Sequence, residues 1–309
     1  MLLREWRAGI KYGGQGRCGI LGDRCVGGCV WELAVASVWG ALGGHCAPRW
    51  PLVRDRMWVM REGSMATIRW SGEGANVAGA RERAFEVDRD GVLIPGLLWT
   101  PDSGSGPQPL ILMGHGGTGH KRNARMLELG NMFARDYGWC AAAIDAPGHG
   151  ERGTVGDLAG FAEWWGDGSV VVEAIADWRV TLDMLERLGE VDSARIGYWG
   201  MSMGTMLGVP YVASDDRVSV AVLGKAGLTG PIPEQTGVDA EFEEYAPQIE
   251  VPVLFSMQWD DELFDRDGQF ELFDLIGSED KRLHAYPGAH AEYGEETVEM
   301  HADFLERQL

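Results

Sequence analysis

The most constraining feature of the sequence is a short apolar segment that runs directly into a glycine-flanked serine. Residues 194–199 read Ala-Arg-Ile-Gly-Tyr-Trp, which suits a strand, and Gly200-Met-Ser202-Met-Gly204 follows. Such spacing is typical of a sharp strand-to-helix turn, in which the serine backbone is strained and neighbouring side chains have no room. Residues 203–209 are compatible with a helix. The segment therefore predicts a strand, a tight turn that exposes the Ser202 hydroxyl, and a helix.

Ser202 is a candidate nucleophile because a hydroxyl pushed out of such a turn can reach a bound substrate. A serine attacks poorly near neutral pH unless a base takes its proton, and that base is normally a histidine oriented by a carboxylate. The spacing alone is a weak signal, since a chain with 45 glycines can contain it as a turn without chemistry. The flanking strand and helix favour a hydrolase or acyl transferase.

The base and the acid are expected downstream, because in this arrangement they follow the serine in chain order. Residues 251–257 form a proline-containing apolar run that suits a buried parallel strand, and residues 281–286 form another strand candidate. A Pro-Gly-Ala turn after the second run presents His290, the predicted base. Asp261 is the preferred acid, because its distance from the first strand fits a loop that turns back toward the serine. Asp260 is a close alternative.

A glycine-rich loop, Gly-His-Gly-Gly-Thr-Gly-His-Lys, follows the strand expected at residues 109–113. Acyl transfer places negative charge on the carbonyl oxygen, which backbone N–H groups must stabilise. We expect Gly117 and Met203 to supply these two donors, and His115 and Gly116 to contact substrate. The glycine spacing matches neither a phosphate-binding P-loop nor a dinucleotide-binding loop.

An aromatic-rich insertion precedes the helix expected near residues 170–189. Trp164 and Trp165 lie in it, together with Phe161. These rings are expected to line an acyl or alcohol pocket, and aromatic packing of the insertion on the sheet is the alternative.

These segments together resemble the α/β-hydrolase superfamily, in particular its dienelactone-hydrolase-like and small serine esterase branch. In chain order, the matching segments are 115–117, 145–150, 200–204, 258–262 and 287–290. The resemblance covers roughly residues 80–309 and implies an α/β-hydrolase fold: a mostly parallel sheet with helices on both faces and a short cap insertion. It also implies a carboxylic ester hydrolase that acts on small-molecule esters through an acyl-enzyme, without cofactor or metal.

The sequence departs from the family pattern in one informative place. Ser202 stands where true dienelactone hydrolases carry cysteine, so the lactone substrate does not transfer. A serine at position 202 also argues against the haloalkane dehalogenase and epoxide hydrolase members, which use an aspartate nucleophile. Two alternatives stay open: a serine peptidase or amidase on the same fold, and a catalytically silent binding member. The absence of a large gating domain in the sequence makes peptide substrates the weaker expectation.

Charge and cysteine content bear on partners and compartment. The formal net charge is −20, with +4 on residues 1–64 and −24 on residues 65–309. Such an acidic body argues against nucleic acid and anionic membranes as partners. No apolar run reaches a transmembrane length of about 20 residues.

Four of the five cysteines lie in the first 46 residues, in a spacing that lacks the paired C-x₂-C of a zinc site. Only Cys140 lies in the remainder, which favours a cytoplasmic protein without disulfides.

The chain divides into two parts by composition. Residues 1–64 are rich in Gly, Trp and Arg, show no helical or strand period, and are expected to be a poorly ordered extension. Residues 65–309 are expected to form the catalytic domain, in which strands and helices alternate as in a parallel sheet covered on both faces. The expected strands are 83–87, 92–99, 109–113, 139–144, 194–199, 217–223, 251–257 and 281–286.

Overall fold

The structure is a computed structural model. It describes residues 66–77, 79–102, 106–153, 155, 158–166 and 168–309. These residues all belong to the compact unit Val59–Leu309. The segment 1–64, expected to be an extension, lies outside the described residues.

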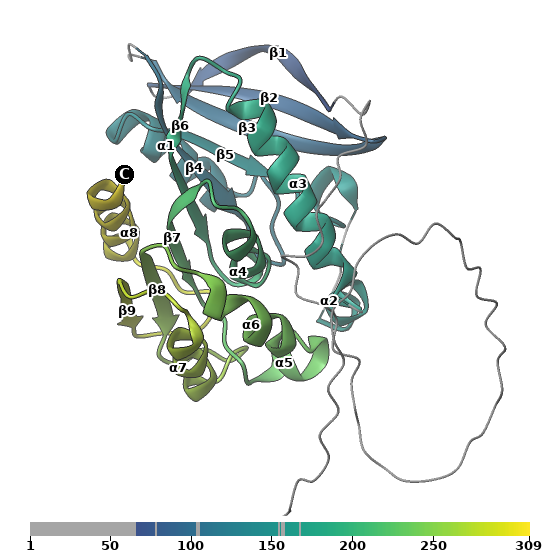
Figure 1. The fold of residues 1–309 in the computed structure, drawn as a ribbon, viewed down its shortest axis with the longest axis vertical. Coiled ribbons are helices and arrows are strands. Elements are labelled where there is room, and N and C mark those ends of the chain that lie inside the picture. Colours follow the sequence, from purple (N-terminus) through teal and green to yellow (C-terminus); the bar gives the residue numbers. More distant parts are fainter. Residues whose placement is uncertain (1–65, 78, 103–105, 154, 156–157, 167) are drawn as a thin grey trace, which may run out of the picture. The chain divides into compact units, whose positions relative to one another are not determined.

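A nine-stranded sheet organises the described part of the chain (Figure 1). Its strands are β1 Thr67–Val77, β2 Ala80–Arg89, β3 Val92–Pro101, β4 Gln108–Gly114, β5 Cys140–Ile144, β6 Val191–Gly200, β7 Val218–Gly224, β8 Val253–Gln258 and β9 Lys281–Tyr286. The spatial order is β1-β2-β3-β5-β4-β6-β7-β8-β9. In this spatial order, every neighbouring pair of strands from β5 through β4 to β9 is parallel. Strands β1, β2 and β3 add an antiparallel extension next to β5.

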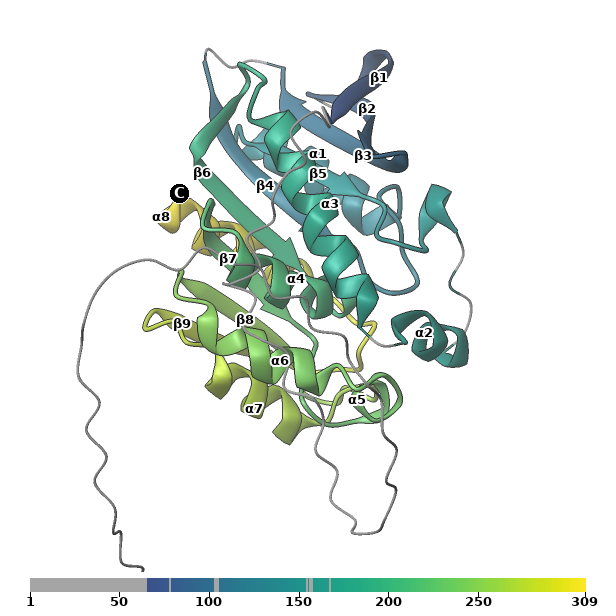
Figure 2. The same cartoon turned by 45° about the vertical axis from the view of Figure 1, so that its right-hand side comes forward.

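Helices cover both faces of this sheet (Figures 1 and 2). They are α1 Ala124–Asp136, α2 Leu158–Trp165, α3 Ser169–Leu185, α4 Met203–Ser214, α5 Pro231–Thr236, α6 Asp239–Tyr245, α7 Arg266–Leu275 and α8 Glu295–Gln308. Helices α1 and α8 lie on one face, and α3, α4, α6 and α7 lie on the other (Figure 2). Because both faces are covered, parallel strands such as β5 read as continuous apolar runs rather than alternating ones. None of the helices in the described ranges has the length and apolarity to cross a membrane.

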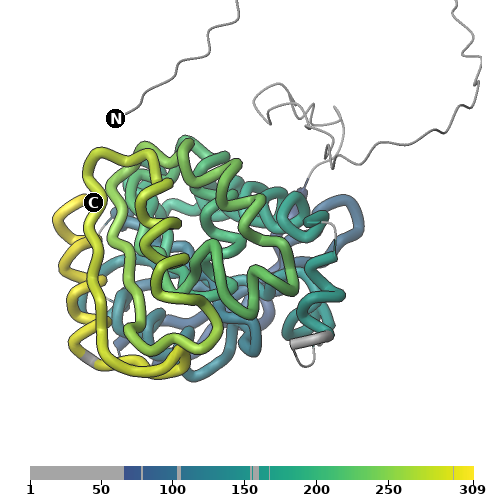
Figure 3. Tube along the Cα trace, turned by 90° about the horizontal axis from the view of Figure 1, so that it is seen from below, coloured from purple at the N-terminus to yellow at the C-terminus, as the bar shows by residue number. Residues whose placement is uncertain are grey.

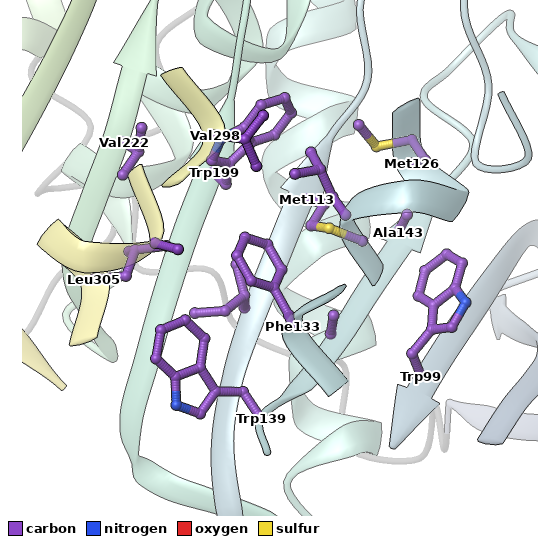
Figure 4. Close-up of a cluster of buried hydrophobic side chains, with 14 of the residues drawn as sticks. Trp99, Met113, Met126, Phe133, Trp139, Ala143, Trp199, Val222, Val298 and Leu305 are labelled. Atoms are coloured by element: carbon purple, nitrogen blue, oxygen red, sulfur yellow. The ribbon is translucent and has the colours of Figure 1, made fainter. Parts of the chain in front are cut away.

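A buried apolar cluster fixes the central strands against α1 and α8. Met126 and Phe133 of α1 and Leu305 of α8 meet Met113 of β4 and Trp199 of β6 (Figure 4). Burial of each side chain of this size contributes about 1.5–3 kcal/mol to the stability of the fold. The cluster therefore holds firm the two strands whose carboxyl ends lead into the glycine loop and the serine turn.

The structure differs from the expected elements in two places. Strand β1 was not expected, because only its first residues, Thr-Ile-Arg-Trp-Ser, alternate between polar and apolar, and the rest of the strand is exposed. Pairing with β2, from Thr67 opposite Asp88 to Val77 opposite Ala80, is what orders it. The Pro- and Gly-bearing stretch 227–248, for which no helix or strand was expected, contains the short helices α5 and α6. Helix α5 begins at a proline and ends before a left-handed Gly237, the usual punctuation of a short helix.

The parallel direction of the central strands decides where the loops that follow them meet. Figure 3 shows β1–β3, in blue, toward one end of the sheet and the yellow C-terminal elements toward the other. Since β4, β6, β7, β8 and β9 are parallel, the loops after them emerge at the same edge of the sheet. The glycine loop, the serine, both candidate acids and His290 all lie in these loops.

Candidate active site

Ser202 occupies a strained turn between β6 and α4. Its backbone angles are φ 58° and ψ −122°, a conformation that residues other than glycine rarely adopt. A Cβ atom on Gly204 would collide with the Gly114 carbonyl, and one on Gly200 would collide with the Gly204 carbonyl. The Ser202 N–H donates to the Gly224 carbonyl at 3.0 Å, which ties the turn to the end of β7. Close backbone approach therefore explains why both flanking residues are glycine.

His290 lies in the loop between β9 and α8 and connects the serine to a carboxylate. Its Nε2 is 2.9 Å from Ser202 Oγ, and its Nδ1 is 2.8 Å from Asp261 Oδ2. The His290 side chain is 13% exposed, whereas the Asp261 side chain is fully buried. The structure thus brings three side chains from three separate loops into one hydrogen-bonded chain.

The loop after β8 separates the two candidate acids. Asp261 Oδ1 accepts hydrogen bonds from the N–H groups of Leu263 and Phe264, at 2.9 and 3.0 Å, so its second oxygen is held toward His290. The Asp260 carboxylate is 68% exposed and lies 3.8 Å from Arg266. Only Asp261 is therefore placed to orient the imidazole.

A second serine–histidine pair occurs deep in the core. Ser256 Oγ and His301 Nε2 are 2.6 Å apart, and both residues are buried. Trp199 Nε1 donates to His301 Nδ1, and burial lowers the pKa of this histidine to about 3. Neither substrate nor water reaches this buried pair. It therefore contributes to the packing of α8 on the sheet.

The expected oxyanion donors, Gly117 and Met203, belong to the glycine loop after β4 and to the start of α4. Met203 is the first residue of α4, where backbone N–H groups have no acceptor within the helix and the helix dipole favours negative charge. In the glycine loop, the carbonyl of Gly116 accepts from Gly119 N–H at 2.8 Å and lies 2.9 Å from His115 Nδ1. Because a trans peptide points its C=O and N–H in opposite directions, these bonds fix the direction of the Gly117 N–H.

The structure gives His115 a different place from the expected substrate contact. Its Nε2 accepts the Ala146 N–H at 3.1 Å while its Nδ1 donates to Gly116, so both ring nitrogens are engaged by backbone. The ring is buried, and that burial lowers its pKa to about 4. His115 thus acts as a brace for the glycine loop and has no polar atom left for substrate.

The expected pocket tryptophans pack differently from each other. Trp165 is almost fully buried within the α2 region. Trp164 is partly buried and its ring centroid lies 4.9 Å from that of His149, whose Nε2 is 2.9 Å from the Gly117 carbonyl. Phe161 lies against the glycine loop, since a Cβ on Gly117 would be 2.9 Å from its ring. Trp164 packs on His149, which itself contacts that loop, and Trp165 packs against Phe161 and Trp164.

Two contacts of the histidine loop had no sequence signal. The Phe264 ring centroid lies 5.8 Å from that of His290, and the Glu262 carboxylate accepts the His290 N–H at 2.8 Å. Both residues follow the acid in the β8–α7 loop: the Phe264 ring packs near the imidazole, and the Glu262 carboxylate fixes the His290 backbone. Within the described ranges, no group of three or more His, Cys, Asp or Glu residues is placed to hold a metal ion.

Comparison with known proteins sets this geometry in a family. A cold-adapted esterase from an Arctic intertidal metagenomic library, solved as a PEG-bound complex, is 37% identical over 78% of this chain and 99% of its own, with a TM-score of 0.70. The chain belongs to the esterases of the α/β-hydrolase superfamily. The expected superfamily branch and fold class are thereby confirmed.

More distant α/β hydrolases share the fold of this esterase. The acetyl xylan esterase from Paenibacillus sp. R4 is 19% identical over 79% of this chain and 89% of its own, with a TM-score of 0.61. The protein m3DLH is 19% identical over 75% of this chain and 100% of its own, with a TM-score of 0.60. No protein-family model matches the chain, and a search of curated proteins finds no match either.

We predict that acid destabilises this esterase through His115. Its pKa is about 4 in the folded state against 6.5 for a free imidazole, so between these values the unfolded chain binds the extra proton and the folded chain does not. The free energy of unfolding is therefore unaffected by His115 above pH 6.5 and falls by about 3 kcal/mol on acidification to pH 4. Urea unfolding at pH 7, 5.5 and 4.5 measures this loss.

The matched variant for that measurement is His115→Asn, which cannot titrate in this range. It should show a shallower loss of stability with falling pH than the wild type, because the remaining acid sensitivity comes from other groups. Parallel slopes for the two proteins would contradict the assignment of the acid sensitivity to His115.

Proposed function

We propose that this esterase hydrolyses small-molecule carboxylic esters through Ser202, His290 and Asp261, with an acyl-enzyme intermediate. The observation that carries the proposal is the continuous hydrogen-bonded chain from Ser202 Oγ through the imidazole to Asp261, at 2.9 and 2.8 Å. Distances of this length are within reach for proton transfer from a nucleophile to its base.

In the first half of the cycle, Ser202 Oγ attacks the ester carbonyl carbon and His290 Nε2 accepts its proton. Asp261, which accepts from His290 Nδ1, keeps the imidazole in the required tautomer and stabilises its cationic form. The N–H groups of Gly117 and Met203 bind the oxyanion of the tetrahedral intermediate. His290 then protonates the leaving alkoxide, so the alcohol departs and the acyl group stays on Ser202.

The second half reverses these proton transfers with water. His290 takes a proton from a water molecule as that water attacks the acyl-enzyme carbonyl, and a second oxyanion forms between the same two N–H groups. Collapse of this intermediate returns the proton to Ser202 Oγ and releases the carboxylic acid. Every proton in the cycle passes through one nitrogen, His290 Nε2, which lies beside the attacking oxygen.

A fluorophosphonate probe tests the covalent step directly. It should label the wild-type protein at one serine, and peptide mass spectrometry should place the adduct on Ser202, because a phosphonate captures a serine whose proton a base removes. A folded protein that resists labelling would support the silent binding member instead. An adduct on another serine would refute the assignment of the nucleophile.

The choice between ester and amide substrates needs a separate comparison. We expect p-nitrophenyl esters to be cleaved and aminopeptide anilides to be left intact or cleaved far more slowly. A series of acyl chain lengths then defines the preferred acid. Comparable kcat/KM values for anilides and esters would favour the peptidase or amidase alternative.

A further inference from the structure

Lys225 is a buried cation beside the histidine loop that the proposed cycle does not use. It follows β7 directly, and only 6% of the residue is exposed. Its backbone adopts φ 51°, in the left-handed region that favours glycine. A lysine held in a strained backbone and out of water has two costs, the strain and the lost hydration, so its side-chain contacts need an explanation.

The Lys225 ammonium grips the loop that carries His290. Its Nζ donates to the carbonyl of His290 at 2.9 Å and to the carbonyl of Glu292 at 2.6 Å, and lies 4.6 Å from the centre of the Tyr293 ring. Gln258, at the end of β8, donates to the same Glu292 carbonyl at 2.5 Å. The hydrogen-bond partners of the cation are thus backbone carbonyls, which fix main-chain position rather than neutralise charge.

Gly224, the residue before Lys225, holds the serine turn through its backbone carbonyl. The Gly224 carbonyl accepts the Ser202 N–H at 3.0 Å and the Thr205 hydroxyl at 2.7 Å. The Lys225 N–H in turn donates to the Ser256 carbonyl at 2.8 Å, which anchors the pair of residues to β8. One dipeptide at the end of β7 therefore contacts the serine turn through its backbone and the histidine loop through its side chain.

We propose that Lys225 is a positioning residue, which holds the His290 loop at the distance from Ser202 that proton transfer requires. The inference rests on the proposed function, because it assigns Lys225 a role only through His290 as base. A displacement of about 1 Å in a reacting group can cost about 100-fold in rate. The hydrogen bond from Lys225 to the His290 carbonyl can therefore affect the rate of proton transfer from Ser202 to His290.

Charge at Lys225 supports this role and makes it testable by pH. Burial lowers the pKa of its ammonium to about 8, opposed by the nearby carboxylates of Asp261, Glu262 and Glu292 and assisted by Arg125, which faces it from α1. The residue is therefore mostly charged at pH 7, and it loses one N–H donor and its charge as the pH rises through about 8. We expect kcat of the wild type to decline over that interval.

The decisive variant is Lys225→Met, which keeps the length of the side chain and removes the donors. We expect kcat for a p-nitrophenyl ester, and the rate of fluorophosphonate labelling, to fall by about 10- to 100-fold, with KM changed by less than about threefold. The decline of kcat near pH 8 should disappear. Lys225→Gly is the second variant: it removes the ammonium but relieves the backbone at φ 51°, so it compensates for a folding defect.

The matched control is Lys281→Met. Lys281 Nζ also donates to backbone carbonyls, those of Phe273, Asp274 and Ile276, and lies 5.1 Å from the Phe273 ring, but it serves the end of α7. This variant should lower the Tm while kcat stays within about twofold and the decline near pH 8 persists.

The outcomes separate this inference from the proposed function. If either folded Lys225 variant matches Lys281→Met in kcat and pH profile, while Ser202→Ala is inactive, the positioning role is wrong and the proposed function stands. If Ser202→Ala keeps its activity, the proposed function itself fails. If neither Lys225 variant folds, a wild-type kcat that stays level from pH 7.5 to 9.5 overturns the inference, and a decline that Lys281→Met retains supports it.

Discussion

Replacement of Ser202 by alanine should lower kcat/KM for p-nitrophenyl acetate by about 10⁶-fold, because the nucleophile is lost and only the oxyanion donors and substrate binding remain. The fold should survive, since among the described residues the Ser202 hydroxyl hydrogen-bonds only to His290, and the strain at φ 58° is carried by the backbone. Initial rates and active-site titration measure the effect, and circular dichroism checks the fold.

Ser256→Ala is the matched control for this prediction. It also removes a serine hydroxyl from a histidine Nε2, but from the buried pair with His301. We expect it to lower the free energy of unfolding by about 1–2 kcal/mol and to leave kcat/KM within about threefold. A Ser202→Ala protein with activity within tenfold of the wild type would show that hydrolysis proceeds by another route.

Replacement of Asp261 by asparagine should lower kcat by about 10³- to 10⁴-fold with little change in the fold. The Leu263 and Phe264 N–H groups donate to Oδ1, so the asparagine oxygen stays there and its NH₂ group is turned toward His290. That NH₂ donates where a carboxylate accepted, which forces the proton of a neutral imidazole onto Nε2. Nε2 then cannot take the proton of Ser202.

The neighbouring residue supplies the comparison. Asp260→Asn makes the same chemical change on an exposed side chain 3.8 Å from Arg266, so kcat should stay within about threefold of the wild type. Steady-state kinetics of the two variants side by side distinguish the acids. A large loss in Asp260→Asn together with a small one in Asp261→Asn would reverse the assignment.

Local physics explains what could be predicted from the sequence. Gly200 and Gly204 mark a turn in which backbones approach too closely for a Cβ, and that constraint is legible in a five-residue window. Apolar runs such as Cys140–Ile144 predict buried parallel strands for a similar reason, since both faces of such a strand avoid water. These signals predicted the serine turn and the buried strands, whereas the superfamily followed from the resemblance of several motif segments taken in chain order.

Other features depend on partners that are distant in the chain. Strand β1 is exposed along most of its length, and beyond a short alternation at Ile68 and Trp70 it depends on pairing with β2. His115 looks available to substrate in the sequence, yet its ring nitrogens are taken by the Gly116 carbonyl and the Ala146 N–H. The side chain of Lys225 reaches the His290 loop 65 residues away, in a contact that no motif indicates.

By itself, the sequence determined the alternation of strands and helices, the serine turn and the order of the loops that emerge at one edge of the sheet. Only the tertiary structure brings the Asp261 carboxylate, and not that of Asp260, to His290, and places the Ser256–His301 pair in the core. Short-range patterns encode backbone angles and burial, which act within a few residues. Convergence of Ser202 and His290, 88 residues apart, depends instead on how whole strands and loops pack, because hydrogen bonds form only within about 3 Å.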